Sequence, residues 1–323
     1  MTIGFRIWIL SLPFILFAPS SLWAAERLEA VHGIVAGSGV NYIHFYLGTQ
    51  RGFYREEGMD LRLTYVRGTL VGPAIISGGA DYILSMTPEA ILYGAKVGLP
   101  IKIVMGLVNS PNWDLYAHPS IKTVQDLKGK LIQTGSIGGT QSQVVKLALK
   151  QLGLNPEKDL TFIAGGPSSQ RILALKSGAA DATVLAMPGN FVAEAMGFRK
   201  LLSLGEIVPV PSGGILASER KIKENPHQVK RMIRATSKSV HYMLSHKEEA
   251  VALLARDLRN DLELAAKAYE AFIPFVSRDG LLTEAQLQLL LKIHGASGLA
   301  PGQVADFTFV KEVAKELNSG ARP

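Results

Sequence analysis

The chain has 323 residues, of which 47% are hydrophobic, and a formal net charge of +7 at pH 7. This composition excludes a disordered protein and provides enough apolar side chains for two domains. Cysteine is absent, which excludes disulfides, thiol catalysis and cysteine-ligated metals. The basic excess slightly favours anionic partners. However, the sequence lacks the dense Lys/Arg runs with interleaved aromatics of a nucleic-acid surface, so we expect no nucleic-acid partner.

The first 25 residues have the pattern of a secretory signal peptide. Arg6 precedes an apolar run over residues 7–18, and the small pair Ala24 and Ala25 follows. An N-terminal membrane anchor is the weaker alternative, because the run is shorter than the roughly 20 residues that a spanning helix needs. The exit of the segment has no cysteine to be lipid-modified. We therefore expect a periplasmic monomer, exported through its signal peptide and not a lipoprotein.

Beyond this segment, strands and helices alternate along the chain. The hydrophobic pattern predicts strands over residues 28–36, 60–66, 82–86 and 101–108, with helices between them. After residue 115 the pattern restarts, with strands predicted over residues 131–133, 160–164 and 182–185, and from about residue 218 it is helical. Such alternation with short loops predicts an α/β fold with mostly parallel sheets flanked by helices.

One short motif occurs twice, about a hundred residues apart. The segment SGGAD at residues 77–81 is repeated as SGAAD at 177–181, and each copy precedes a short apolar strand and a proline. The repeat predicts two lobes of similar build, with Asp81 and Asp181 as structural caps at strand starts. We expect a signal peptide over residues 1–25, a first lobe over 26–114, a second lobe over 115–215, and a return to the first lobe with C-terminal helices over 216–323.

The candidate ligand-binding residues lie in the loops that follow the strands. Ligands of parallel α/β sheets bind beyond the carboxyl ends of the strands, where loop amides and helix N-termini converge. These loops are rich in Gly, Ser, Thr and Asn. The candidates are Ser38, Gly39, Asn41, Arg67, Thr69, Thr87, Asn112 and Trp113 in the first lobe, and Ser136, Gly139, Thr140, Ser168, Met187 and Asn190 in the second.

Each candidate also has an ordinary structural interpretation. Small polar residues are common turn formers, so any single Ser or Thr in these loops is more often a loop residue than a ligand contact. Arg67 lies at a strand end and suits a carboxylate, sulfonate or phosphate oxygen, as does the helix start near Thr140, but Arg67 is equally well placed to face solvent. Trp113 is either a core or hinge residue or a lid over an organic molecule. A basic run over residues 220–234 is interpreted as a solvated helix face, with transporter docking as the lesser alternative.

The sequence offers no recognisable catalytic arrangement. It contains no G-x-S-x-G, no H-E-x-x-H and no Gly-Lys-Ser/Thr after a glycine loop, so it lacks the residues of serine hydrolases, zinc proteases and P-loop enzymes. The seven histidines are scattered, and His241 and His246 are five residues apart, which does not place them on one helix face. We therefore expect no catalytic residue, no cofactor and no metal site.

Several scaffold motifs together resemble one family. They are GFYREEGMDL at residues 52–61, SGGAD at 77–81, GLPIK at 98–102, VQDLKGK at 124–130, LKSGAADA at 175–182 and NP at 225–226. With these motifs the chain resembles, from about residue 31 to 244, the periplasmic binding proteins of nitrate, sulfonate, taurine and bicarbonate ABC importers and the related thiamine-precursor (pyrimidine) binding proteins. The resemblance implies a type II fold, with two α/β lobes joined by a two-strand hinge. It also implies closure on a small solute and delivery to a membrane permease with its ATPase.

Two other functions stay open at this point. The same scaffold carries fungal pyrimidine-synthesis enzymes, although these use a cysteine-rich motif that is absent from this chain. A periplasmic subunit that reports its bound ligand to a signalling receptor is the other alternative. The loops that differ among family members determine the ligand, so the resemblance does not transfer a substrate.

Overall fold

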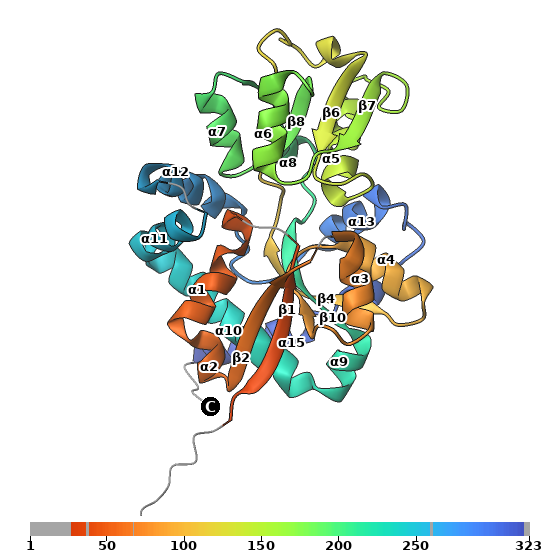
Figure 1. Cartoon of the computed structure of the whole chain (residues 1–323). Coiled ribbons are helices and arrows are strands. Elements are labelled where there is room, and N and C mark those ends of the chain that lie inside the picture. The colour runs from red at the N-terminus through yellow and green to blue at the C-terminus, as the bar shows by residue number, and fades with distance from the viewer. Residues whose placement is uncertain (1–26, 37–38, 67, 259–260, 320–323) are drawn as a thin grey trace, which may run out of the picture.

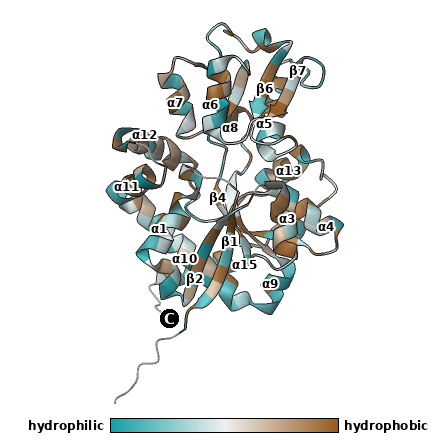
Figure 2. Cartoon of the chain, viewed as in Figure 1, coloured by the Kyte–Doolittle hydropathy of each residue, from teal (hydrophilic) through white to brown (hydrophobic). Residues whose placement is uncertain are grey.

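The computed structural model describes residues 27–36, 39–66, 68–258 and 261–319, and these form two lobes (Figure 1). The predicted signal peptide lies outside the described residues. Within them, none of the helices combines the length and the apolar character that crossing a membrane requires. Hydrophobic residues follow the central strands and α3, whereas α9 is largely hydrophilic (Figure 2).

The first lobe contains a five-stranded sheet in the order β2-β1-β3-β10-β4. Parallel pairing joins β1 to β2 and β3, and β10 runs antiparallel to β3 and β4. The strands are β1 (Glu29–Val35), β2 (Met59–Tyr65), β3 (Tyr82–Ile83), β4 (Ile101–Val108) and β10 (Gly213–Ser218). Between them lie η1 (Val40–Tyr42), α1 (Ile43–Arg51), α2 (Phe53–Glu56), α3 (Gly68–Ile76) and α4 (Pro88–Lys96).

The second lobe repeats this plan with a sheet in the order β7-β6-β8-β5-β9. Its strands β6, β7 and β8 are parallel, and β5 is antiparallel to β8 and β9. The strands are β5 (Trp113–Ala117), β6 (Lys130–Thr134), β7 (Leu160–Ala164), β8 (Ala182–Ala186) and β9 (Arg199–Ser203). The helices are η2 (Gln125–Leu127), α5 (Thr140–Gln151), α6 (Ser168–Ser177) and α7 (Gly189–Ala195).

The repeated SG-x-AD motif occupies the same place in both lobes. Asp81 precedes β3, and its carboxylate accepts a hydrogen bond of 2.9 Å from the backbone N–H of His32 on β1. Asp181 precedes β8, and its carboxylate accepts a 2.9 Å bond from the N–H of Leu131 on β6. Each aspartate thus ties the start of one central strand to its neighbour, which confirms the predicted duplicate architecture and the structural role of both residues.

The chain crosses between the lobes twice. The first crossing spans residues 109–112, between β4 and β5, and the second spans residues 204–212, between β9 and β10, and includes α8 (Leu204–Ile207). The predicted boundaries after residues 114 and 215 therefore fall inside β5 and β10. Both strands are antiparallel to a neighbour, whereas a pattern of alternating strands and helices predicts parallel strands.

The C-terminal segment is helical and packs mostly on the first lobe. Asn225 caps α10 by accepting a hydrogen bond of 3.2 Å from the N–H of Gln228, and Thr283 and Gln286 form a capping box at the start of α13. The segment contains α9 (Glu219–Glu224), α10 (Pro226–Ser245), α11 (Lys247–Leu258), α12 (Leu262–Phe272), η3 (Ile273–Phe275), α13 (Glu284–Ile293), α14 (Pro301–Val304) and α15 (Thr308–Ser319).

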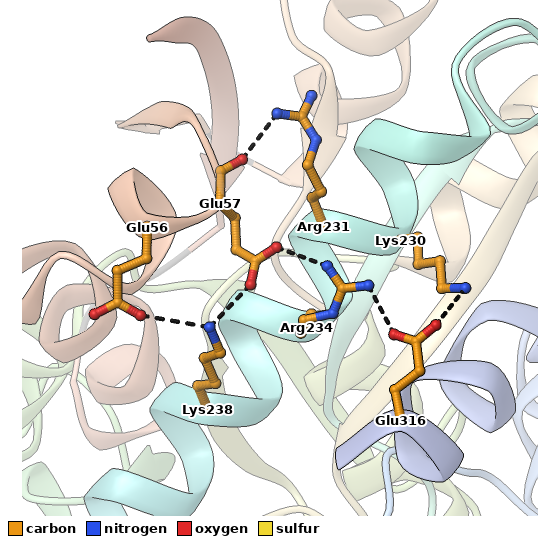
Figure 3. A network of polar contacts seen from close by, with 7 residues as sticks. All are labelled: Glu56, Glu57, Lys230, Arg231, Arg234, Lys238 and Glu316. Carbon is orange, nitrogen blue, oxygen red and sulfur yellow. Dashed lines mark hydrogen bonds and ion pairs between the residues drawn. The ribbon is translucent and has the colours of Figure 1, made fainter. Parts of the chain in front are cut away.

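The basic residues of α10 form ion pairs inside the first lobe (Figure 3). Arg234 donates to Glu57 and to Glu316 at 2.7 Å each, and Lys238 bridges Glu57 at 2.9 Å and Glu56 at 3.4 Å. The side chains of Arg234 and Glu57 are only 15% and 7% exposed. The prediction of a solvated basic face is therefore wrong for this part of α10, whose positive charges tie it to α2 and α15.

Candidate functional site

Two of the predicted loops, those after β1 and β8, lie against each other where the lobes join. Gly39 of the first lobe lies against Met187 of the second, and a Cβ atom at Gly39 would be 3.1 Å from the Met187 carbonyl oxygen. Gly39 also has a φ of +104°, so both the contact and the backbone favour glycine. The loop after β1 and the loop after β8 therefore meet where the lobes join.

At the first crossing, Asn41 and Asn112 bind each other. The Asn41 Nδ2 donates to Asn112 Oδ1 at 3.2 Å, and the Asn112 Nδ2 donates to Asn41 Oδ1 at 2.9 Å. Asn112 is only 3% exposed. This reciprocal pair fixes η1 against the crossing and leaves each amide with part of its hydrogen-bonding capacity. Trp113, next along the chain, is partly buried against the core shared by the lobes.

Asn190 and Thr87 are both buried, but they differ in how many hydrogen-bond partners their side chains have. Asn190 is 2% exposed and donates to Asp114 Oδ2 at 2.9 Å, while its own Oδ1 accepts from the Phe191 N–H. Thr87 is 3% exposed at the N-cap of α4, and its buried hydroxyl has no hydrogen-bond partner. Asn190 therefore braces the start of α7, whereas Thr87 retains an unused polar group.

The start of α5 holds a carboxylate, but the carboxylate belongs to the protein. Thr140 Oγ1 donates to Glu89 Oε1 of the first lobe at 3.4 Å and lies 3.4 Å from His294 Nε2. Burial raises the pKa of Glu89, and hydrogen bonds from the backbone of Glu89 and from Thr140 partly offset this rise. Burial lowers the pKa of His294 to about 4, so its imidazole is neutral near pH 7. Neither Glu89 nor His294 was among the sequence candidates.

A buried arginine lies beneath the other loops of the second lobe. Arg171 of α6 is 4% exposed, and its guanidinium donates to Gln141 at 2.8 Å and to the candidate Ser168 at 3.1 Å. Sequence reasoning missed Arg171 because it lies three residues inside a helix. The sign of burial in the sequence was that Arg171 lies next to the apolar residue Ile172 and one helical turn before Leu175.

The structure says less about the other candidate residues. Ser136 is exposed on the loop after β6, and a Cβ at Gly139 would lie 2.5 Å from its hydroxyl. Ser38 and Arg67 lie outside the described residues, as does the side chain of Thr69. Within the described part of the chain, no three His, Cys, Asp or Glu side chains are grouped to hold a metal ion.

Comparison with known proteins identifies the family. A family model described as NMT1/THI5 like matches residues 40–250. The chain belongs to this family. It is also 24% identical over 318 residues to YtlA of Bacillus subtilis (strain 168), which is named as a candidate binding protein, and the match covers 95% of each chain.

Two solved structures show the same fold. The periplasmic aliphatic sulphonate binding protein SsuA of Escherichia coli superposes with a TM-score of 0.68 and 20% identity, covering 83% of this chain and 91% of SsuA. The periplasmic nitrate-binding protein NrtA of Synechocystis PCC 6803 gives a TM-score of 0.72 and 16% identity, covering 90% of this chain and 89% of NrtA. The predicted two-lobed binding-protein fold and the family resemblance are both confirmed.

Proposed function

We propose that the protein is the extracytoplasmic solute-binding component of an ABC importer. It captures a small anionic solute between its lobes and delivers it to a membrane permease with its ATPase. The observation that carries this proposal is the junction at which polar, glycine-containing loops of both lobes meet, with Gly39 against Met187. The names of SsuA and NrtA, which share the fold, support a sulfonate- or nitrate-like solute.

An enzyme on the same scaffold is the second candidate, since the family description includes the name THI5. Catalysis of that kind would need a nucleophile or a poised acid–base pair near the junction. The junction offers Glu89 and His294, which share Thr140 as a partner, and the chain has no cysteine. This arrangement supports binding without turnover better than it supports a reaction. A ligand sensor would share the same binding step.

Export is expected to remove the first 24 or 25 residues. The basic start, short apolar run and small-residue exit are the features that signal peptidase substrates share. N-terminal sequencing of the protein recovered from the periplasm should begin at Ala25 or Glu26. Recovery of a chain that retains Met1 in the membrane fraction would contradict both the export and the proposed role.

Solute binding is expected to close the lobes. A solute that contacts both lobes binds the closed form more tightly and so shifts the equilibrium towards it. The solute should first be identified by mass spectrometry of small molecules released when freshly purified protein is denatured. Small-angle scattering should then show a smaller radius of gyration when that solute is added back. An unchanged scattering profile at saturation would argue for a rigid scaffold.

A further inference from the structure

Arg171 is a buried positive charge without an acidic partner. Its side chain forms no ion pair with any carboxylate in the described part of the chain, and its two hydrogen bonds go to the neutral side chains of Gln141 and Ser168. Its Nε is buried and has no hydrogen-bond partner. Burial lowers the pKa of Arg171 to about 10, which still leaves it charged at pH 7. A buried charge costs stability unless another charge compensates it, so this arrangement calls for a compensating anion.

Two glycines keep space for this guanidinium. A Cβ atom at Gly165 would lie 2.6 Å from Arg171 Cγ and 2.9 Å from Cδ, and a Cβ at Gly135 would lie 3.2 Å from Nη1. The N–H of Gly135 also donates to Gln141 Oε1 at 2.9 Å, the same oxygen that accepts from Arg171. The loops after β6 and β7 are therefore both shaped around the arginine.

The same place contains a second unsatisfied group and lies under the exposed loops. Gln133 is 9% exposed, its Oε1 has no partner, and a Cβ at Gly165 would lie 3.0 Å from its Cδ. The covering loop residues, 135–136 and 165–168, are partly or fully exposed. A solute bound at these loops would lie near the guanidinium and near the first turns of α5 and α6, whose N–H groups attract anions.

The Glu89 carboxyl group of the first lobe disfavours a second negative charge on the solute. Glu89 reaches across from the first lobe to Thr140, and a Cβ at Gly139 would lie 3.8 Å from its Oε1. Arg171 compensates one negative charge. A second negative charge on the solute would remain unpaired in a partly buried site next to the Glu89 carboxyl group, which is unfavourable at low dielectric.

We propose that Arg171 provides the charge that recognises the solute, and that the solute is a monovalent oxyanion, such as a carboxylate, a sulfonate or nitrate. This inference rests on the proposed solute-binding function. It differs from the expectation placed on Arg67, because it locates the charge in the second lobe and excludes divalent anions.

The test measures binding of defined anions by calorimetry. The probes are acetate, methanesulfonate, nitrate and sulfate as sodium salts, against chloride at equal ionic strength. The parent protein should bind at least one monovalent probe more tightly than sulfate. Arg171→Met should weaken that binding about tenfold to a hundredfold, the range expected for losing a charge-assisted hydrogen bond. Its melting temperature should be unchanged or higher, because an uncompensated buried charge is removed.

Matched variants separate this role from structural ones. Arg199→Met removes an exposed arginine of the same lobe on β9, where Arg199 pairs with Ala117 at the opposite end of the sheet, and should leave binding unchanged. Arg171→Gln can keep polar contacts with Gln141 and Ser168 without the charge, and replaces Arg171→Met if the latter fails to fold. Arg67→Ala tests the alternative location of the charge.

Four outcomes would overturn the inference. The first is unchanged affinity in the Arg171 variants, and the second is loss of binding only in Arg67→Ala. The third is tighter binding of sulfate than of every monovalent probe. The fourth is a released solute that is neutral and closes the lobes, while none of the anions binds. In the last case the solute-binding function stands and only the anion site fails. If no released or added solute binds or changes the scattering profile, the proposed function fails as well.

Discussion

Acidification is expected to destabilise the first lobe through His44. This residue of α1 is 2% exposed, and its Nε2 has no hydrogen-bond partner. Burial lowers the pKa of His44 to about 3. In the unfolded chain the imidazole takes up a proton as the pH falls through about 6.5, whereas in the folded protein it stays neutral until about pH 3. Its contribution to stability is therefore complete above pH 6.5 and is lost progressively below it.

The expected loss is large. Well below pH 6.5 each further pH unit costs about 1.4 kcal/mol, so the free energy of unfolding should fall by about 2 kcal/mol between about pH 6.5 and about pH 4.5 through this group alone. Urea unfolding at several pH values measures it. His294 also has a lowered pKa, so it destabilises the folded protein in acid as well. The quantity to compare is therefore the slope of the free energy of unfolding against pH in the parent and in His44→Leu.

A matched histidine serves as the control for this slope. His118 lies exposed after β5, and His118→Gln shows what removing an exposed histidine does to the same measurement. The leucine variant should show a shallower decline in acid whatever its stability at neutral pH, because it has no proton to take up at this position. If the stability of His44→Leu falls as steeply as that of the parent when the pH is lowered, then His44 is not the group responsible.

The sequence predicted the scaffold better than the site, for a physical reason. Strand and helix periodicity is local, and the repeated aspartates at residues 81 and 181 mark equivalent strand starts in both lobes. The strands β5, β9 and β10 were not predicted, since they are defined by antiparallel pairing with distant partners. Their omission shifted the predicted lobe boundaries into β5 and β10.

The site depends on contacts between distant parts of the chain. The rule that ligands lie beyond strand ends selected the loops after β1 and β8, which contact each other through Gly39 and Met187. That these loops bind the solute stays a prediction. It also predicted that the start of α5 suits a carboxylate, but not that Glu89, from the other lobe, would supply one. Arg171 was missed because an arginine within an apolar-periodic helix gives no local sign that it lacks an acidic partner.

Replacing Gly205 with alanine is expected to disrupt the region where the two crossings touch. Gly205 lies in α8, and a Cβ atom there would be 2.1 Å from the Pro111 carbonyl oxygen and 2.8 Å from Ser110 Oγ. The crossings are also joined by hydrogen bonds, from Ser110 Oγ to the Gly205 carbonyl at 3.0 Å and from Ser212 Oγ to the Ser110 carbonyl at 3.1 Å. The added methyl group would force the two backbones apart.

The cost should appear in both stability and lobe movement. Inserting a methyl group into a packed site costs about 1–3 kcal/mol, and the upper part of this range applies because the nearest atom is a backbone oxygen. Chemical denaturation of Gly205→Ala measures that loss, and scattering reports whether the solute-induced closure persists. We expect weaker closure, because both crossings must bend together for the lobes to approach.

A second glycine provides the control for this substitution. Gly302 lies in α14, and a Cβ there would meet no atom within 4 Å. Gly302→Ala should therefore leave the protein as stable or slightly more stable, since alanine favours a helix by up to about 1 kcal/mol. If Gly205→Ala matches Gly302→Ala in stability and closes normally, the two crossings can separate freely, and their contact does not control how the lobes move.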